Sequence, residues 1–117
     1  MLFYCYNKCS TCRKAQKWLD EHDVDYDIRD IKTDNPDLAE LELWHQASGL
    51  PLKKFFNTSG QLYRSLELSK KLPGMSDAEQ YALLASDGML VKRPILITDD
   101  NKVLVGFKED QWAETLG

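Results

Sequence analysis

Residues 2–19 read LFYCYNKCSTCRKAQKWL, an apolar run followed by a helical pattern, with two cysteines at the junction. Residues 2–6 are apolar and rich in aromatic side chains, which favours a strand buried on both faces. Asn7 and Lys8 interrupt this run. Apolar side chains then recur at helical spacing, at Cys12, Ala15, Trp18 and Leu19. This spacing predicts a helix over residues 10–22, so the chain opens with a buried strand that leads directly into an amphipathic helix.

The middle of the chain, about residues 34–90, is predicted to be helical. Asn35-Pro36 favours a helix start, because Asn caps helices and Pro lacks the N–H that the first turn does not need. Residues 51–56 are expected to form a short helical turn. Ser76, with Glu79 three residues later, is a capping box that predicts the start of a further helix.

Strand patterns flank this helical middle. Residues 24–29 alternate in the manner of a strand, and residues 94–98 and 103–107 read as a hairpin followed by a closing helix over 108–116. In the order β-α-β, helices, β-β-α, the first unit should be parallel and right-handed, whereas the hairpin is antiparallel. We therefore predict an α/β fold in one domain, residues 1–117, with a mixed four-stranded sheet and a helical insertion.

Composition and charge narrow the function classes. Lys and Arg total 15 against 19 Asp and Glu, and the net charge is −4. Direct binding of nucleic acid requires a basic face, and the basic residues are scattered. No apolar run approaches the roughly 20 residues that span a bilayer, and the apolar start lacks the flanking features of a signal peptide. We expect no membrane association and a cytoplasmic location, where disulfides are usually transient or catalytic.

Cys9 and Cys12 are the expected reactive centre. Their spacing places both sulfurs on one side of the first helical turn, close enough for a disulfide. Unpaired N–H groups at a helix start carry partial positive charge, and Lys8, Arg13 and Lys14 add more nearby. Positive charge favours the thiolate, which is the nucleophilic form. We predict that the pKa of Cys9 is lowered, that Cys9 attacks and that Cys12 resolves.

Other interpretations of the cysteines are half of a zinc site or two inert thiols. Tetrahedral zinc needs four ligands, and only Cys5, His22 and His45 remain, without paired spacing, so we predict no metal site. Cys5 lies inside the first strand and is expected to be a small buried hydrophobe. A Cys-x-x-Cys pair that follows a strand and opens a helix is typical of a redox motif rather than of inert thiols.

Lys92-Arg93-Pro94 is the second feature of interest. A proline at the start of a strand removes no ladder hydrogen bond, so a plain strand boundary would explain it. Alternatively, Pro94 forms a cis-proline loop that faces the cysteines, with Arg93 close enough to bind an anion. The sequence leaves both open, because the cis isomer is a minority state at X-Pro bonds.

Four segments together resemble the arsenate reductase (ArsC)/Spx family over essentially the whole chain: Arg13-Lys14-Ala15 after the cysteine pair, Lys92-Arg93-Pro94-Ile95, residues 55–64 and residues 105–109. The resemblance implies a thioredoxin-like (glutaredoxin-like) fold with a helical insertion. It also implies that Cys9 is the nucleophile, Pro94 the cis-proline and Arg93 an anion-binding arginine.

The chain departs from the family's arsenate reductases, which hold the oxyanion with three arginines. Only Arg93 maps to one of them, while Asn57 and Phe107-Lys108 stand near the other two positions. Fewer guanidinium groups weaken a bidentate grip on arsenate. We expect Arg93, Arg13 and Asn57 to bind the anionic group.

Two functions follow from the resemblance. The first is reduction of a disulfide, a glutathione mixed disulfide or arsenate by Cys9 and Cys12, with glutathione, thioredoxin or glutaredoxin as the electron donor and no bound cofactor. The presence of Cys12 as an internal resolving thiol favours a general thiol–disulfide role. The alternative is an Spx-type redox-sensing transcriptional regulator that binds the RNA polymerase alpha subunit.

Overall fold

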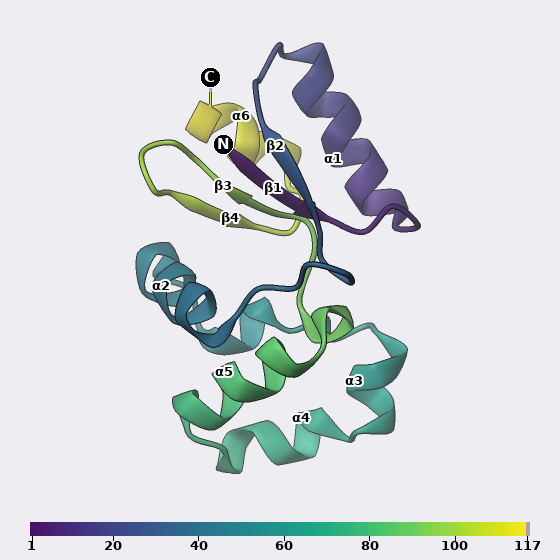
Figure 1. The fold of residues 1–117 in the computed structure, drawn as a ribbon, viewed down its shortest axis with the longest axis vertical. Helices are drawn as coiled ribbons and strands as arrows, with labels where there is room; N and C mark the ends of the chain where they lie inside the picture. Colours follow the sequence, from purple (N-terminus) through teal and green to yellow (C-terminus); the bar gives the residue numbers. More distant parts are fainter. Residues whose placement is uncertain (117) are drawn as a thin grey trace.

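The computed structural model describes residues 1–116 and contains one mixed sheet with helices on both faces (Figure 1). The strands are β1 (Leu2–Cys5), β2 (Asp27–Asp30), β3 (Ile95–Ile97) and β4 (Val103–Val105). The α-helices are α1 (Ser10–Glu21), α2 (Leu38–Ser48), α3 (Gln61–Ser65), α4 (Leu68–Lys71), α5 (Asp77–Ser86) and α6 (Glu109–Leu116). Three short 3-10 helices complete the chain: η1 (Leu52–Phe55), η2 (Leu72–Gly74) and η3 (Gly88–Leu90).

The sheet has the order β2-β1-β3-β4. β1 runs parallel to β2 and antiparallel to β3, and β3 and β4 form an antiparallel hairpin. The prediction of a mixed four-stranded sheet with a parallel first unit and a closing hairpin is therefore confirmed. β1 lies in the interior of the sheet, which explains its continuous apolar run.

Successive residues of β1 point to opposite faces of the sheet and so contribute to two separate cores. Phe3 and Cys5 pack with α1 and α6 in a cluster that we call the α1 core; its buried members also include Cys12, Ala15, Trp18, Leu19, Leu96, Leu104 and Trp112. Tyr4 points to the other face, where α2 packs against β4 and α3 to α5 lie further from the sheet (Figure 1). We call this second cluster the insertion core.

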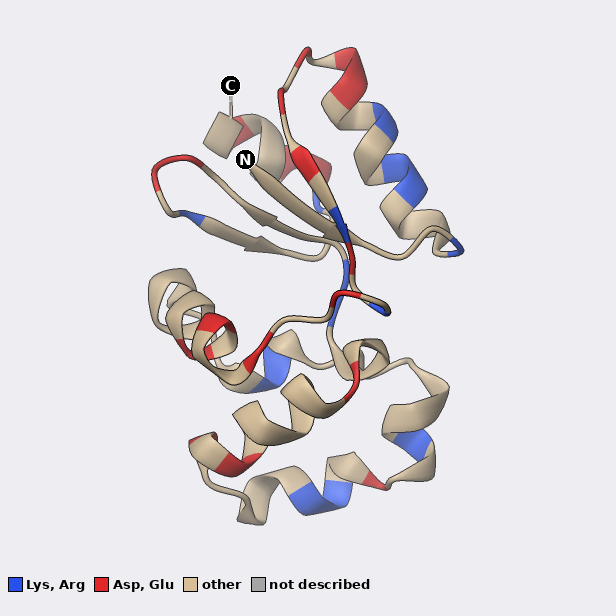
Figure 2. Ribbon diagram, viewed as in Figure 1, with Lys and Arg blue, Asp and Glu red and all other residues tan. Residues whose placement is uncertain are grey.

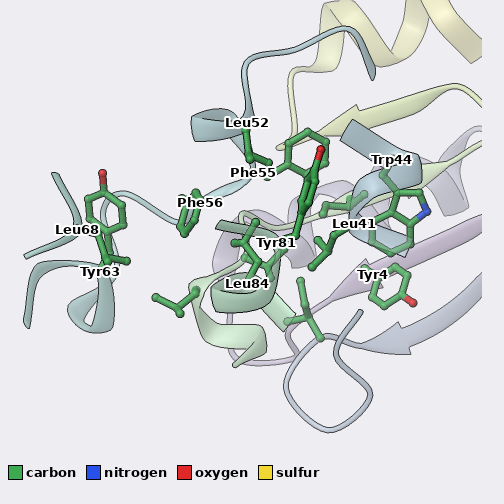
Figure 3. Packing of buried hydrophobic residues seen from close by; sticks show 14 of the residues in the cluster. Tyr4, Leu41, Trp44, Leu52, Phe55, Phe56, Tyr63, Leu68, Tyr81 and Leu84 are labelled. Atoms are coloured by element: carbon green, nitrogen blue, oxygen red, sulfur yellow. The ribbon is translucent and has the colours of Figure 1, made fainter. Parts of the chain in front are cut away.

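The insertion core is rich in aromatic side chains (Figure 3). The ring of Tyr4 meets that of Trp44 edge-on, with 4.9 Å between centroids. Phe55, Phe56 and Leu84 are fully buried or nearly so. Trp44 belongs to the insertion core and Trp18 and Trp112 to the α1 core, so all three tryptophans are core residues.

The predicted start of α2 is wrong. Its N-cap is Asp37, whose side chain accepts from the N–H of Glu40, while the Glu40 side chain accepts from the Asp37 N–H. Asn35 instead donates from its side-chain amide to the carbonyl of Ala85, 2.7 Å away. A contact with a residue 50 positions further along the chain thus competes with the local capping role.

β2 is shorter than its sequence pattern predicts. The strand begins at Asp27 rather than at Val24, because its pairing with β1 starts where Asp27 lies opposite Leu2. Val24 and Tyr26 are half-buried against the α1 core. Ile28, expected on the same side as these two residues, is 53% exposed at the edge of the sheet.

The remaining predicted helices agree with the structure. α1, η1 and α6 lie within a few residues of their predicted bounds, and Ser76 caps α5 through a capping box with Glu79. The sequence patterns did not separate α3, α4, η2 and η3 within the insertion. None of the helices in residues 1–116 combines the length and apolar character that crossing a membrane requires.

Candidate functional site

Cys9 occupies the N-cap position of α1, at the end of the loop that leaves β1. Its N–H donates to the carbonyl of Tyr6, 3.0 Å away, and its own carbonyl accepts from the N–H of Arg13 at 3.1 Å. These two backbone hydrogen bonds hold the loop against the first helical turn. Cys9 is half-buried whereas Cys12 is 2% exposed, so only the first sulfur of the pair is open to a reactant.

The surroundings of Cys9 favour its thiolate. Partial burial works in the opposite direction, but hydrogen bonding to the backbone and thiol of Cys12, to the Arg93 guanidinium and to the backbone of Thr11 outweighs it, and the pKa of Cys9 is lowered. The predicted direction of the shift is thus supported, with Arg93 in place of the exposed Lys8 and Lys14 as the basic partner.

The pKa of Cys12, in the same motif, shifts in the opposite direction from that of Cys9. Burial, together with the nearby sulfur of Cys9, raises the pKa of Cys12 to about 12, although the N–H of Tyr6 donates to its sulfur at 3.3 Å. All three cysteines are free. The reduced pair therefore combines one thiol poised to ionise with one that stays protonated at neutral pH.

The peptide bond between Arg93 and Pro94 is cis, the isomer that the family resemblance implies. Pro94 is anchored to the end of β4, because its carbonyl accepts from the N–H of Gly106 at 2.8 Å. The guanidinium of Arg93 lies 5.2 Å from the centroid of the Tyr6 ring. Its Nε and Nη1 atoms are buried and have no hydrogen-bond partner among the described residues, so they are available to an anionic ligand.

Cys9 and Arg93 line a common cavity of about 330 Å³, which we call the thiol cavity. Its other lining residues are Thr11, Asn57, Ser59, Gly60, Lys92, Val105, Gly106, Phe107 and Lys108. The structure therefore brings together Cys9, Arg93, Asn57 and the Phe107-Lys108 pair, from four separate parts of the chain. The positions that the resemblance relates to three oxyanion-binding arginines all reach this one cavity.

Backbone contacts position the Asn57 wall of the thiol cavity. The N–H of Asn57 donates to the carbonyl of Leu90 at 2.7 Å, and its carbonyl accepts from Gly60 at 3.0 Å. A side chain at Gly60 would begin 2.6 Å from the Asn57 amide nitrogen, so the turn closes tightly over that amide. Asn57 is thereby held at the cavity by a turn that only the fold of the insertion brings close to α1.

Arg13 is not brought to the thiol cavity. Its Nε donates to the carbonyl of Asn7 at 3.2 Å, and the side chain lies exposed on the outer face of α1 with Lys17 and Glu21. We therefore leave Arg13 out of the anion site. Lys92 and Lys108, to which the sequence assigned no role, line the cavity instead. A signal for Lys92 was its position directly before Arg93.

Metal-ligand geometry does not appear in residues 1–116, where no three His, Cys, Asp or Glu side chains gather as a cluster that could hold an ion. Cys5 is buried in the α1 core as predicted. Burial, with Asp30 and Cys9 nearby, raises the pKa of Cys5. Cys5 is therefore a poor nucleophile beside Cys9.

Comparison with known proteins relates this geometry to a family. The model of the ArsC family matches residues 4–115. The uncharacterized protein YusI of Bacillus subtilis is 57% identical over 114 residues, which cover 97% of this chain and 96% of YusI. The structure of a "possible arsenate reductase" from Streptococcus mutans is 48% identical, covers 96% of each chain and superposes with a TM-score of 0.87.

A regulator is also among the relatives. Global transcriptional regulator Spx 2 of Bacillus cereus is 25% identical over 111 residues, which cover 95% of this chain and 82% of the regulator. The solved neighbours and the sheet order agree on the predicted thioredoxin-like fold.

Proposed function

The chain belongs to the ArsC family, and we propose that it is a thiol–disulfide oxidoreductase in which Cys9 attacks and Cys12 resolves. The observation that carries this proposal is that the two sulfurs differ in burial and in the direction of their pKa shifts. Cys9 opens into the thiol cavity with a lowered pKa, whereas Cys12, three residues later, is buried with its pKa raised. A nucleophile must be ionised and accessible, and a resolving thiol must be near and protected until it is needed.

The reaction consists of two exchanges. The Cys9 thiolate attacks one sulfur of a substrate disulfide; the substrate S–S bond breaks, a Cys9–substrate disulfide forms, and the other half leaves as a thiolate. Cys12 then loses its proton to the departing sulfur or to solvent and attacks the sulfur of Cys9. The substrate disulfide gains two electrons and leaves as two thiols, and the protein loses these two electrons as its two cysteine thiols become a Cys9–Cys12 disulfide.

Arg93 stabilises negative charge at the reacting sulfurs. It contributes to the lowered pKa of Cys9, and its buried Nε and Nη1 atoms are free to donate to an anionic substrate group. Arsenate is a weaker candidate substrate, because Arg93 is accompanied by Asn57 and Lys108 rather than by two further guanidinium groups. Glutathione, thioredoxin or glutaredoxin would reduce the Cys9–Cys12 disulfide in the cytoplasm.

Substitution of each cysteine in turn tests the mechanism. Turnover of a glutathione mixed disulfide, with glutathione or thioredoxin as the donor, should be abolished in Cys9→Ser. In Cys12→Ser, treated with the mixed disulfide in the absence of a thiol donor, the protein should stop as a Cys9–substrate disulfide, visible by mass spectrometry. Cys5→Ser is the matched control and should retain turnover. Unchanged turnover in Cys9→Ser would disprove the assignment.

A second candidate function is that of a redox-sensing regulator, favoured by the similarity to Spx 2. In this case the Cys9–Cys12 disulfide would change the affinity for the RNA polymerase alpha subunit. Retention of the chain on immobilised alpha subunit, compared between reduced and oxidised protein, tests this. Absence of binding in both states would eliminate the regulator.

A further inference from the structure

A second cavity, of about 390 Å³, adjoins the thiol cavity. We call it the lysine pocket; it is lined by Lys53, Lys54, Lys92 and Lys108, with Phe56 and Val105 among its apolar residues. Lys92, Val105 and Lys108 line both cavities, so the two share a wall. A ligand whose sulfur reaches Cys9 can therefore extend its remaining part into the lysine pocket.

The fold places these lysines together from three parts of the chain. η1 supplies Lys53 and Lys54, and the N–H of Lys92 donates to the carbonyl of Phe55 at 2.7 Å, which ties η1 to the segment before Pro94. The stem of Lys92 lies against Gly106, since a Cβ there would be 3.3 Å from its Cε. Lys92 is thus located at the boundary between the two cavities.

The charge of the pocket is uncompensated. None of its four lysines forms an ion pair with another residue of the described chain, and no Asp or Glu of residues 1–116 lines either cavity. Together with Arg93, five positive side chains line the two cavities, although the net charge of the whole protein is −4. Lys and Arg are otherwise distributed over separate elements such as α1, α3 and α4 (Figure 2). A local concentration of one sign, in a concave site, raises the local concentration of an oppositely charged ligand.

We propose that the lysine pocket binds the tail of the substrate thiol, and that this tail carries several phosphates. The inference rests on the proposed function, since it requires a substrate disulfide at Cys9. The half of the disulfide that becomes bonded to Cys9 would place its phosphates among Lys53, Lys54, Lys92 and Lys108. A short apolar or amide linker between sulfur and phosphates would pack on Val105, which lines both cavities.

The same residues argue against a tail that is a zwitterion. Glutathione carries an ammonium group beside its carboxylates, and such a group would find no acidic partner in either cavity. A phosphate-bearing thiol has no such group near its phosphates and presents more negative charge to the five basic side chains. The size of each cavity, 330 and 390 Å³, is that of a small-molecule site rather than of a flat protein-docking surface.

The exchange step balances as before. Cys9 attacks the sulfur of the phosphate-bearing half, the S–S bond breaks, and the other half leaves as a thiolate. Cys12 then displaces the phosphate-bearing thiol and forms the Cys9–Cys12 disulfide. Two electrons pass from the two cysteines to the substrate, and an external dithiol returns them.

Three mixed disulfides with one common leaving group test the proposal. Coenzyme A, glutathione and 2-mercaptoethanol, each joined to 2-thiopyridine, release the same chromophore when Cys9 attacks. In the Cys12→Ser chain at low salt, the coenzyme A compound should react about tenfold faster than the 2-mercaptoethanol compound, and faster than the glutathione compound. The advantage should shrink as salt is added.

Substitution of lysine pairs tests whether the faster reaction of the coenzyme A compound depends on the lysine pocket. K53Q/K54Q should reduce the coenzyme A rate about three- to tenfold and leave the 2-mercaptoethanol rate unchanged. The matched control is K70Q/K71Q, a second exposed lysine pair, on α4 and outside both cavities, which should change neither rate. An unchanged coenzyme A rate in K53Q/K54Q would overturn the proposal.

The remaining outcomes are equally decisive. Equal rates for the three compounds, all lost in Cys9→Ser, would leave the proposed function intact and reject the phosphate-binding pocket. A glutathione rate equal to or above the coenzyme A rate would reject the phosphates. A glutamate-rich peptide disulfide that reacts faster than the coenzyme A compound would reject the phosphate-bearing ligand and favour an acidic protein partner. Rates that Cys9→Ser leaves unchanged would reject the proposed function itself.

Discussion

The two faces of the sheet contribute different parts of the candidate site. The α1 face contributes the reactive sulfur, at the end of a strand and the start of a helix that are neighbours in sequence. The insertion face contributes Asn57 and the turn around it, and through η1 it contributes Lys53 and Lys54. Chemistry at Cys9 is thus encoded locally, whereas the cavity that selects a substrate depends on residues far along the chain, from Lys53 to Lys108. The following experiments test this division.

The largest loss of stability is expected for Trp112→Ala in the α1 core. The indole is fully buried, lies 4.9 Å from the ring of Phe107 and donates to the carbonyl of Gly106 at 3.1 Å. Its removal should lower the free energy of unfolding by about 3–5 kcal/mol, measured by urea denaturation. Glu114→Ala, at an exposed position of the same helix, should change it by less than about 0.5 kcal/mol. A loss below about 1 kcal/mol for Trp112→Ala would show that α6 is not required for this core.

A comparable truncation in the insertion core tests whether the two faces unfold together. Leu84 is fully buried, and Leu84→Ala should cost about 2–4 kcal/mol, while Leu43→Ala, at a position 64% exposed, should cost little. The sequence predicts a single domain, which should lose far-UV and near-UV circular dichroism in one coincident transition in both variants. Two separate transitions would instead show that the insertion is a domain of its own.

The cysteine pair should differ about a hundredfold in alkylation rate at pH 7. Because the pKa of Cys9 is lowered, its reaction with iodoacetamide should rise with pH and reach a plateau below the ordinary thiol range, whereas Cys12 should stay protonated until near pH 12. Mass spectrometry of Cys9→Ser and Cys12→Ser between pH 5 and 9 separates the two, since these limits bracket the ordinary thiol pKa of about 8.5. A midpoint at or above the ordinary thiol value in Cys12→Ser would contradict the electrostatic assignment.

The smallest effects are expected at the two helix caps of the insertion. Ser76→Ala and Asp37→Ala each remove a side chain that accepts from the third amide of its helix, at a cost of about 1 kcal/mol. Ser69→Ala, which removes an exposed hydroxyl from α4, is the control. Thermal unfolding of the three variants measures the difference. An undiminished Tm in Asp37→Ala would mean that Asn35 can take over the capping role.

The features predictable from sequence were those whose cause lies within a few residues. The strand at residues 2–6 and the helix after Cys9 follow from hydrophobic period and length, and the Ser76–Glu79 capping box is a contact between neighbours on one turn. The position of Cys9 at a helix start, and with it the direction of its pKa shift, could be predicted for the same reason. Such local interactions are present in any fold that contains the segment.

Only tertiary structure decided the rest. Asn35 satisfies the carbonyl of Ala85 rather than capping a helix, and β2 begins where its backbone meets β1, so neither boundary has a local cause. Arg13 and Arg93 have the same side chain, yet Arg13 is exposed to solvent and Arg93 lines the thiol cavity. The distance of a side chain from Cys9 depends on how separate segments of the chain pack together. Hydrophobic burial drives this packing, and because it is non-directional, a local sequence pattern does not specify which segments meet.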